Sequence, residues 1–411
     1  MYGVGKYDSV HTSAPYRISH VLYDRKMPLY LPWSCFKERI MKCPYCHSDN
    51  TLIFLERKMP TVLSAYSGSF PVKVADMQIS ACKDCLVGFA SKKLSSEELT
   101  EIYDNYSYIS PLNNIGVTKY DGMINTIRKN FSVNDEIIEI GCSEGYLLKK
   151  LRDVGFSNVT GIEPGPQADS AKALGFNVIK GYFDASHAKN KIDGYYLMHV
   201  FEHFEDPFSI FRLMSETLNK TGKIVIEVPN FGGFHIQHLF YYNIYFMQVL
   251  SRANDLKIID YFIENGNLRV VFTKSENVRY REINLVFDKR KYIENLTDIK
   301  NSYESSRERV NDFLRGKNTV FWWGAGSASV ILLNEIERNV LGNTKIVVVD
   351  GDRNKSNLTI PGVNLKVDHY SILNGTHINN LVIASSFYKE IFDSIELSGI
   401  TYDHVEVFSY A

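Results

Sequence analysis

The sequence predicts an α/β protein that has two separate parallel sheets and a small metal-binding module ahead of them. Three observations support this class. Strand-like and helix-like segments alternate in two regions, a glycine-rich turn opens a helix in each region, and two Cys-x-x-Cys pairs precede both. Alternation with short turns is typical of doubly wound parallel sheets. At 411 residues, of which 45% are hydrophobic, the chain can form two or three domains with sizeable cores.

The charge and hydropathy of the sequence disfavour two classes of protein, those that bind nucleic acids and those that span membranes. The net charge is -1, which gives no support for a nucleic-acid-binding protein, because such proteins carry a basic surface. The sequence has no apolar run of about 18 residues and no signal-peptide pattern. We therefore expect a cytoplasmic protein without nucleic-acid or membrane partners, either a monomer or a weak homo-oligomer.

An irregular extension over 1–40 precedes a small module that we expect over 41–110. The module contains two cysteine pairs with the same spacing, Cys43 with Cys46 and Cys82 with Cys85. Four thiolates in tetrahedral geometry suit a structural zinc ion, and the alternative is a set of reduced, buried thiols. The segment between the pairs is longer than in most zinc ribbons, so we expect it to contain strands of its own.

The first α/β region is expected over 111–280 and the second, smaller one over 318–411, with a polar helical linker over 281–317 between them. In the first region the strand candidates lie at 136–141, 158–164, 176–181, 192–200, 222–230 and 267–274, and the helices at 145–155, 167–175 and 207–220. In the second region the alternating segments lie at 318–336, 344–352, 380–391 and 404–410.

The stretch "EIIEIGCSEGYLLKKL" ends the first of these strands and opens the next helix. Its polar and glycine positions at the junction are Glu139, Gly141, Ser143 and Gly145. Ligands of open α/β sheets bind over such turns, where glycine lets the backbone approach them closely. The stretch is not a P-loop, because no Gly-Lys-Ser/Thr follows, and it lacks the third glycine of a dinucleotide fingerprint.

Two carboxylates further along the chain indicate the ligand. Glu163 ends the next strand about 20 residues later, where an acid can accept both ribose hydroxyls. Asp184 follows the third strand, where it could meet an adenine amino group. A glycine turn, a ribose acid and an adenine contact describe a nucleoside without phosphate, which favours S-adenosylmethionine (SAM). The alternative is a glycine turn that serves only strand-to-helix packing.

Several motifs together resemble a known family. "EIGCSEG", "GIEP" and "HVFEHFEDP" look like motifs of class I SAM-dependent methyltransferases. With "CPYC", "CKDCLVGF", "DNYSYIS", "IVIEVPN", "GNLRVVF", "VFWWGAGSAS" and "SSFYKEIF", residues 41–411 resemble the three-part sugar C-methyltransferases of deoxysugar biosynthesis. The resemblance implies a zinc module, a class I SAM domain and a C-terminal Rossmann-like domain, with a nucleotide-linked sugar as the substrate.

The resemblance also implies catalytic residues. Methylation of a carbon beside a ketone needs a base and stabilisation of the resulting oxyanion. The family's Tyr-x-Glu-His segment corresponds here to "HIQH", with His235 at the Tyr, Gln237 at the Glu and His238 at the proposed base. Gln237 can donate a hydrogen bond but carries no charge that would raise the basicity of a histidine. Methylation of a different sugar, methylation at oxygen, and SAM binding without transfer therefore stay open.

Further site residues rest on the same resemblance. Tyr106 and Tyr108 resemble the tyrosines on the substrate side, and His199 lies in a segment that lines the cofactor pocket. Asn267 and Arg269 are expected near the domain junction, where Arg269 could bind a diphosphate or form a salt bridge. An H-x-x-E-H zinc-protease motif in "HVFEH" is disfavoured, because the segment follows a strand.

The glycine turn of the second region could bind a dinucleotide on its own pattern. Asp350 ends the next strand, where a ribose acid would lie. The resemblance instead implies that this domain packs over the SAM domain and contributes to a nucleotide-sugar pocket. An RNA methyltransferase with a zinc module is a further alternative, which the near-neutral charge disfavours.

Overall fold

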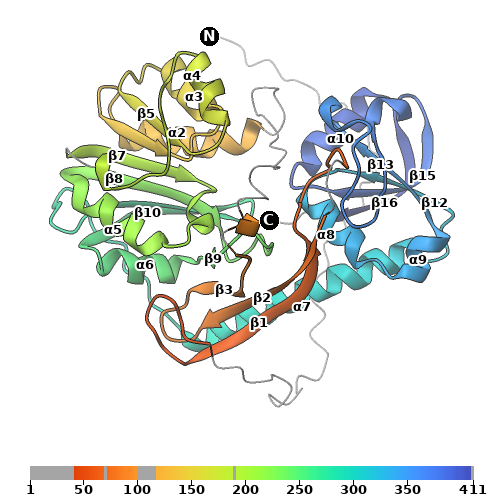
Figure 1. Ribbon diagram of the computed structural model, residues 1–411, viewed down its shortest axis with the longest axis horizontal. Coiled ribbons are helices and arrows are strands. Elements are labelled where there is room, and N and C mark those ends of the chain that lie inside the picture. The colour runs from red at the N-terminus through yellow and green to blue at the C-terminus, as the bar shows by residue number, and fades with distance from the viewer. Residues whose placement is uncertain (1–40, 69–71, 96, 100–116, 188–190, 409–411) are drawn as a thin grey trace, which may run out of the picture. The chain divides into compact units, whose positions relative to one another are not determined.

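The computed structural model describes residues 41–68, 72–95, 97–99, 117–187 and 191–408. Three sheets are present in this part of the chain (Figure 1). The predicted α/β class is confirmed, with one antiparallel sheet at the cysteines and two sheets built around parallel strands. Among the described helices, none combines the length and the apolar character needed to cross a bilayer.

The first sheet has the strand order β1-β2-β3-β9 and is antiparallel. Its strands are β1 (Thr51–Pro60), β2 (Val74–Cys82), β3 (Gly88–Lys92) and β9 (Phe240–Tyr241). The strands expected between the cysteine pairs are therefore present. The last strand, β9, comes from a distant part of the sequence, since Gly88 pairs with Tyr241 and Phe89 with Phe240.

The second sheet has the order β10-β11-β8-β7-β4-β5-β6. Its strands are β4 (Ile137–Ile140), β5 (Val159–Glu163), β6 (Asn177–Lys180), β7 (Ile192–Met198), β8 (Leu218–Pro229), β10 (Leu256–Glu264) and β11 (Asn267–Lys274). The five strands from β8 to β6 are parallel, whereas β11 runs antiparallel to β8 and β10 antiparallel to β11. All four residues of the central β4 are buried, Glu139 among them, as is typical of a strand that is covered on both faces of a parallel sheet.

Helices and short 3-10 turns connect these strands. The helices are α2 (Asp121–Asn130), α3 (Tyr146–Asp153), α4 (Gln167–Ala173), α5 (Pro207–Thr217) and α6 (Ile244–Arg252), and the 3-10 turns are η3 (Val117–Tyr120), η4 (Ala185–His187) and η5 (Phe201–His203). Two local features stabilise the N-terminus of helix α5. The Asp206 side chain accepts a hydrogen bond from the amide of Ser209, and Pro207 occupies the first helical position.

The polar linker forms one long helix, α7 (Lys289–Leu314), which Asp288 caps by accepting hydrogen bonds from two backbone amides. The third sheet follows, with the order β14-β13-β12-β15-β16 and parallel pairing throughout. Its elements are β12 (Thr319–Trp323), α8 (Ser327–Glu335), α9 (Arg338–Asn343), β13 (Lys345–Asp350), η6 (Arg353–Lys355), β14 (Val367–His369), η7 (Tyr370–Leu373), β15 (His377–Ala384), α10 (Tyr388–Leu397) and β16 (Thr401–Phe408).

A buried arginine joins β1 to α7 and α8. The guanidinium of Arg57 lies 2.9 Å from Oε1 of Glu335 and 3.6 Å from the ring centre of Tyr303. The Tyr303 hydroxyl donates a hydrogen bond to the same carboxylate, at 3.4 Å. An ion pair and a cation–π contact at one guanidinium link three elements that are distant in the sequence.

Candidate functional site

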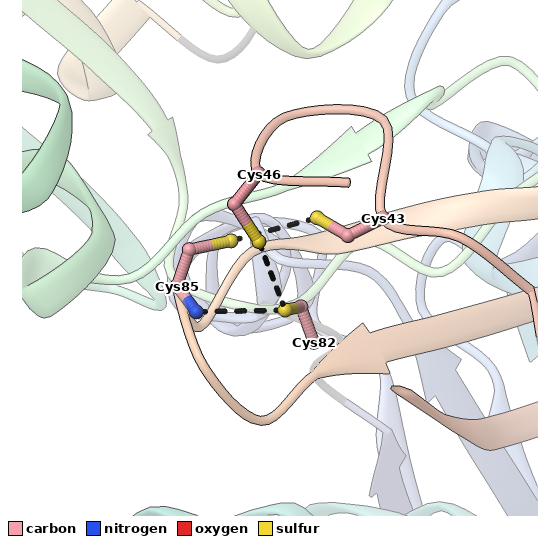
Figure 2. A group of neighbouring side chains, drawn as sticks. All are labelled: Cys43, Cys46, Cys82 and Cys85. Atoms are coloured by element: carbon pink, nitrogen blue, oxygen red, sulfur yellow. Dashed lines mark hydrogen bonds between the residues drawn. The ribbon is translucent and has the colours of Figure 1, made fainter. Parts of the chain in front are cut away.

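The four predicted cysteine ligands lie together. Figure 2 shows Cys43 and Cys46 on the loop before β1, Cys82 at the end of β2 and Cys85 on the turn between β2 and β3, with their sulfur atoms converging. The sulfur atoms of Cys43 and Cys85 are 3.5 Å apart, and those of Cys46 and Cys82 are 3.6 Å apart. The amides of Asp84 and Cys85 each lie 3.4 Å from the Cys82 sulfur.

This arrangement fits a zinc ion. Zinc–sulfur bonds of about 2.3 Å place the sulfurs of a tetrahedron about 3.8 Å apart, close to the observed separations, while a disulfide would need about 2.05 Å. Hydrogen bonding with Cys82, together with burial, raises the pKa of Cys43 to about 12. A full set of thiolates at neutral pH therefore requires a cation at the centre of the cluster.

The cysteine module contacts the segment that contains the predicted catalytic residues. The Leu86 carbonyl accepts hydrogen bonds from the Asn243 side chain at 2.7 Å and from the Tyr292 hydroxyl at 3.0 Å. The amide of Ala90 donates to the Leu239 carbonyl at 2.9 Å. A side chain at Gly88 would lie 2.8 Å from the Phe231 ring, so only glycine allows this close approach. The module therefore holds the backbone on both sides of residues 235–238.

The predicted cofactor turn lies between β4 and α3. Gly141 and Gly145 have φ angles of 79° and 81°, and Ser143 has a φ of 47°. A side chain at Gly141 would lie 2.3 Å from Cγ2 of Val200, so the loop after β7 packs directly on the turn. The backbone at these two positions is left-handed, a conformation that glycine adopts without strain and most other residues do not.

Glu163 ends the neighbouring strand β5 and faces this turn. Its carboxylate accepts hydrogen bonds from the amide of Ser143 at 3.0 Å and from the amide of Gly165 at 2.8 Å. The residue is half-buried, and each carboxylate oxygen has a second lone pair. The carboxylate can therefore hold the turn and still accept hydroxyl groups from a ligand.

The other two predicted cofactor carboxylates differ in environment. Glu139 is buried and accepts a hydrogen bond from the Tyr196 hydroxyl at 3.0 Å. Burial raises the pKa of Glu139 to about 8, so its carboxyl group is protonated at neutral pH without a ligand. Asp184 is exposed and accepts hydrogen bonds from the amide and hydroxyl of Ser186. It caps a local turn at the edge of the sheet.

Four histidines and one glutamate gather at the carboxyl ends of β7 and β8. His199, Glu202 and His203 follow β7, and His235 and His238 follow β8. Oε1 of Glu202 lies 3.4 Å from Nδ1 of His199 and 3.8 Å from Nε2 of His238. The ring centres of His235 and His238 are 3.5 Å apart, and those of His203 and His238 are 4.7 Å apart. We call these five residues the edge cluster.

Glu202 and His238 of the edge cluster are buried, and several polar atoms of the cluster have no hydrogen-bond partner in the described part of the chain. Burial lowers the pKa of His235 to about 3 and that of His238 well below its usual value. Both imidazoles are therefore neutral at neutral pH. Among the described residues, no partner is present for either Glu202 oxygen, for Nδ1 of His235 or His238, or for the side-chain nitrogen of Gln237. His235 is half-buried, whereas His238 is only 6% exposed.

Two of the four predicted substrate residues lie on β11. Asn267 begins β11 beside Pro229 of β8. Arg269 is buried and pairs with Glu227, which is the ion-pair alternative that the sequence left open, and its diphosphate role stays a prediction. Tyr106 and Tyr108 lie outside the described residues.

The second glycine turn, between β12 and α8, has its own carboxylate. Asp350 ends β13 and accepts hydrogen bonds from the amides of Ala325 at 2.7 Å and Asp352 at 2.8 Å. The ammonium group of Lys355 lies 3.0 Å from the same carboxylate. The carbonyl of Ala325 in turn accepts a hydrogen bond from the amide of Ala65 at 3.0 Å. Asp350 is thus fully engaged within the protein.

Sequence reasoning did not assign a role to three charged residues at these sites. These residues are Glu202, Glu227 and Lys355. The "HVFEH" motif marks Glu202 as a residue at the end of a strand, but its burial depends on contacts with residues 235–239. One of these contacts is the hydrogen bond from the Leu239 amide to the Glu202 carbonyl, at 2.9 Å.

Comparison with known proteins identifies the central sheet. Residues 117–274 match a family described as "Methyltransferase domain". Among solved structures, the chain is similar to a SAM-dependent methyltransferase from Mesorhizobium loti, with 14% identity over 36% of this chain and 95% of that one and a TM-score of 0.31. A TehB-like SAM-dependent methyltransferase from Corynebacterium glutamicum shares 18% identity over 40% of this chain and 94% of that one, with a TM-score of 0.33. A third, from Clostridium acetobutylicum, shares 13% identity over 43% of this chain and 98% of that one, with a TM-score of 0.33.

No curated protein matches the chain. The family match covers the glycine turn, the carboxylate at the end of β5 and the seven-stranded sheet. Residues 117–274 therefore form a SAM-dependent methyltransferase domain with the class I sheet.

Proposed function

We propose that this methyltransferase acts on a sugar, linked to a nucleotide, and methylates a carbon beside a ketone. The motifs shared with sugar C-methyltransferases support the substrate class. The observation that carries the proposal is the position of two imidazoles, His235 and His238, at the same sheet edge as the glycine turn and Glu163. A neutral imidazole can accept the proton that must leave the carbon.

The cofactor would lie over the carboxyl ends of β4 and β5. Glu163 would accept the ribose hydroxyls, Gly141 and Gly145 would allow close approach of the backbone, and Asp184 would lie near the adenine. SAM supplies an electrophilic methyl group. Val200 packs on Gly141 and comes only two residues before Glu202, so the loop after β7 connects the cofactor turn to the edge cluster.

Residues of this chain would then remove the proton from the substrate carbon. A histidine of the edge cluster takes the proton from the carbon beside the ketone, and the enolate carbon forms its bond to the methyl group as the bond between methyl and sulfur breaks. His235 is the better exposed of the two catalytic candidates, and His238 is the buried one. Gln237 contributes a hydrogen-bond donor rather than a charge.

The outer parts of the chain would support the site. We assign the four-cysteine cluster to a structural zinc ion, which would fix the module that pairs with β9 and thereby the segment 235–238. The C-terminal sheet, over 318–411, would form part of the nucleotide-sugar pocket, with the linker 281–317 joining it to the methyltransferase domain over 111–280.

The test is an incubation of the full chain with methyl-labelled SAM and a panel of keto-sugar nucleotides, free sugars and unrelated metabolites. We expect label on a keto-sugar nucleotide, and product analysis should place it on carbon. His235→Ala and His238→Ala should each reduce transfer at least about 100-fold with little change in SAM affinity. His404→Ala, an exposed position on β16, is the matched control.

Three results would revise the proposal in different ways. Label on oxygen would make the enzyme a sugar O-methyltransferase, in which the same histidine deprotonates a hydroxyl. Label on a compound that is not a sugar would overturn the substrate class. SAM binding without transfer to any compound, under conditions that leave the protein folded, would favour a binding role.

A further inference from the structure

The edge cluster contains a set of metal-ligand atoms that is separate from the cysteines. One carboxylate oxygen of Glu202 and one ring nitrogen each of His203 and His238 lie within 4.8 Å of one another. Two imidazoles with one carboxylate are a common donor set for zinc and for divalent iron. The three residues come from two segments, the turn after β7 and the turn after β8, which meet at the carboxyl edge of the sheet.

The carboxylate of Glu202 is buried beside two imidazoles. The residue is only 1% exposed, and among the described residues neither oxygen has a hydrogen-bond partner. A buried ionised group without a partner costs several kcal/mol. Two imidazole nitrogens face Oε1 of this carboxylate, Nδ1 of His199 at 3.4 Å and Nε2 of His238 at 3.8 Å, and neither forms a hydrogen bond with it in the described part of the chain.

The backbone fixes the orientation of His203. Nδ1 of His203 lies 3.1 Å from the carbonyl oxygen of Gln237. A carbonyl can only accept, so Nδ1 carries the proton and Nε2 is the nitrogen with the electron pair. Metal-binding histidines are usually held in this way, by a hydrogen bond from the other ring nitrogen to a carbonyl or carboxylate. Gln237 thus orients the His203 ring through its backbone carbonyl, and its side chain has no part in this contact.

A metal ion would draw the three ligand atoms closer together than the 4.8 Å within which they lie. Metal–ligand bonds of about 2.0–2.2 Å place neighbouring ligand atoms of a tetrahedral site about 3.4 Å apart. The observed separation between Glu202 and His238 is 3.8 Å. The backbone on both sides is already joined, because the Leu239 amide donates to the Glu202 carbonyl. The two segments that supply the ligands are therefore already held together.

We infer that Glu202, His203 and His238 bind a divalent transition-metal ion, of which zinc fits the donors best, at a second site beside the cofactor edge. Three protein ligands leave a position open, which is the pattern of a catalytic rather than a structural zinc. Within the proposed function, on which this role rests, the open position binds the ketone oxygen of the substrate and stabilises the oxyanion. His238 is then a ligand, and the better exposed His235 is the residue that takes the proton.

The test counts metal ions without measuring activity. The zinc-loaded full chain is equilibrated with zinc at micromolar concentration, separated from unbound metal and analysed for metal content. We expect two zinc ions per chain for the wild type and one for Glu202→Gln, which has the same shape, and for His203→Ala. Glu205→Gln, an exposed change three residues from Glu202, is the matched control and should keep two.

Cobalt identifies which site is affected. Co²⁺ added to the chain with its cysteine site filled by zinc should give weak visible bands and no sulfur charge-transfer band, because the edge cluster contains only nitrogen and oxygen donors. Glu202→Gln should abolish these bands. One zinc per wild-type chain, or two zinc ions in folded Glu202→Gln, would overturn the inference, and thermal unfolding would confirm that this isosteric variant is folded.

These results are independent of the substrate. Sugar methylation by a chain that binds one zinc would remove the second site and leave the proposed function. Two zinc ions in a chain that methylates no sugar would keep the second site and remove the proposed function.

Discussion

The glycine turns after β4 and β12 have the same construction but different surroundings. Each joins a parallel strand to a helix, and each faces a carboxylate at the end of the neighbouring strand, Glu163 in one case and Asp350 in the other. Asp350 is only 8% exposed and pairs with Lys355. Glu163 is half-buried, and among the described residues it forms no ion pair.

The difference shows that the motif alone does not make a ligand site. Asp350 uses its oxygens on two amides and one lysine, and the loop before β2 covers its turn through the bond between Ala65 and Ala325. Glu163 bonds only to backbone amides and can accept more. We therefore expect the cofactor at the first turn. We interpret the second turn as a structural element whose carboxylate stabilises the fold. The following predictions test this contrast, from the largest effect to the smallest.

The largest effect should come from Asp350→Asn. The change leaves the ammonium group of Lys355 buried without its partner, which typically costs about 3–5 kcal/mol. We expect the free energy of unfolding to fall by about that amount, measured by denaturant titration, while the affinity for S-adenosylhomocysteine stays the same. Adding Lys355→Met should recover part of the loss, because it removes the unpaired charge. A loss of cofactor affinity in folded Asp350→Asn would contradict the contrast.

A pH effect should come from Glu139, a buried carboxyl group on β4, the strand that leads into the first turn. Burial raises the pKa of Glu139 from its usual 4.5 to about 8 in the folded protein. Between these values the folded state holds a proton that the unfolded state has released, so the stability falls as the pH rises from about 4.5 to 8. The total is on the order of a few kcal/mol.

Glu139→Gln should remove this component of the pH dependence. The free energy of unfolding, measured at several pH values, should decline less steeply between pH 5 and 8 in the variant than in the wild type. Parallel curves for the two proteins would show that the carboxyl group is not protonated in the fold.

Glu163→Gln should weaken binding at the first turn only. Hydrogen bonds between a carboxylate and ribose hydroxyls are worth about 1.5–3 kcal/mol, so we expect the dissociation constant for S-adenosylhomocysteine to rise about 10- to 100-fold. Isothermal titration calorimetry gives the value, and an unchanged unfolding temperature would show that the fold is intact. An unchanged dissociation constant would remove Glu163 from the cofactor site.

A pair of glycine substitutions compares the two turns at the backbone. Gly141 has a φ of 79° and no room for a side chain beside Val200, whereas Gly326, which caps α8, has a φ of -102° and open space where a side chain would lie. Gly141→Ala should cost about 1–2 kcal/mol through strain in the left-handed region and weaken cofactor binding about tenfold. Gly326→Ala should change neither binding nor stability measurably. Equal effects of the two changes on binding would argue against a special role of the first turn.

The smallest effect should come from Asp184→Asn. The side chain is exposed and caps its own turn through Ser186, and asparagine keeps an oxygen that can do the same. We expect a change in cofactor affinity of no more than about threefold. A change as large as that of Glu163→Gln would assign Asp184 a stronger contact with the adenine than its exposure indicates.

The sequence predicted the features that depend on local pattern. Both sets of parallel strands, the glycine turns, the linker helix and the four grouped cysteines could be read from periodicity and spacing. The strands that were missed are β9, β10 and β14. β9 has two residues and exists because it pairs with the distant β3, and a pairing between distant segments leaves no local signal.

The candidate site was harder to predict, because its properties arise from burial. Nothing in the sequence separates Glu163 from Asp350, since both follow an apolar strand after a glycine turn. The difference comes from Lys355 and from the loop at Ala65, which only the fold brings into contact with the second turn. For the same reason the burial of the Glu202 carboxylate appears only in three dimensions.

The most direct test of the contrast between the turns is a crystal structure of the chain with S-adenosylhomocysteine. We expect the ribose on Glu163, the backbone of Gly141 beside the cofactor, and the sulfur directed toward the edge cluster. Density for the cofactor at Asp350, or at both turns, would contradict the account.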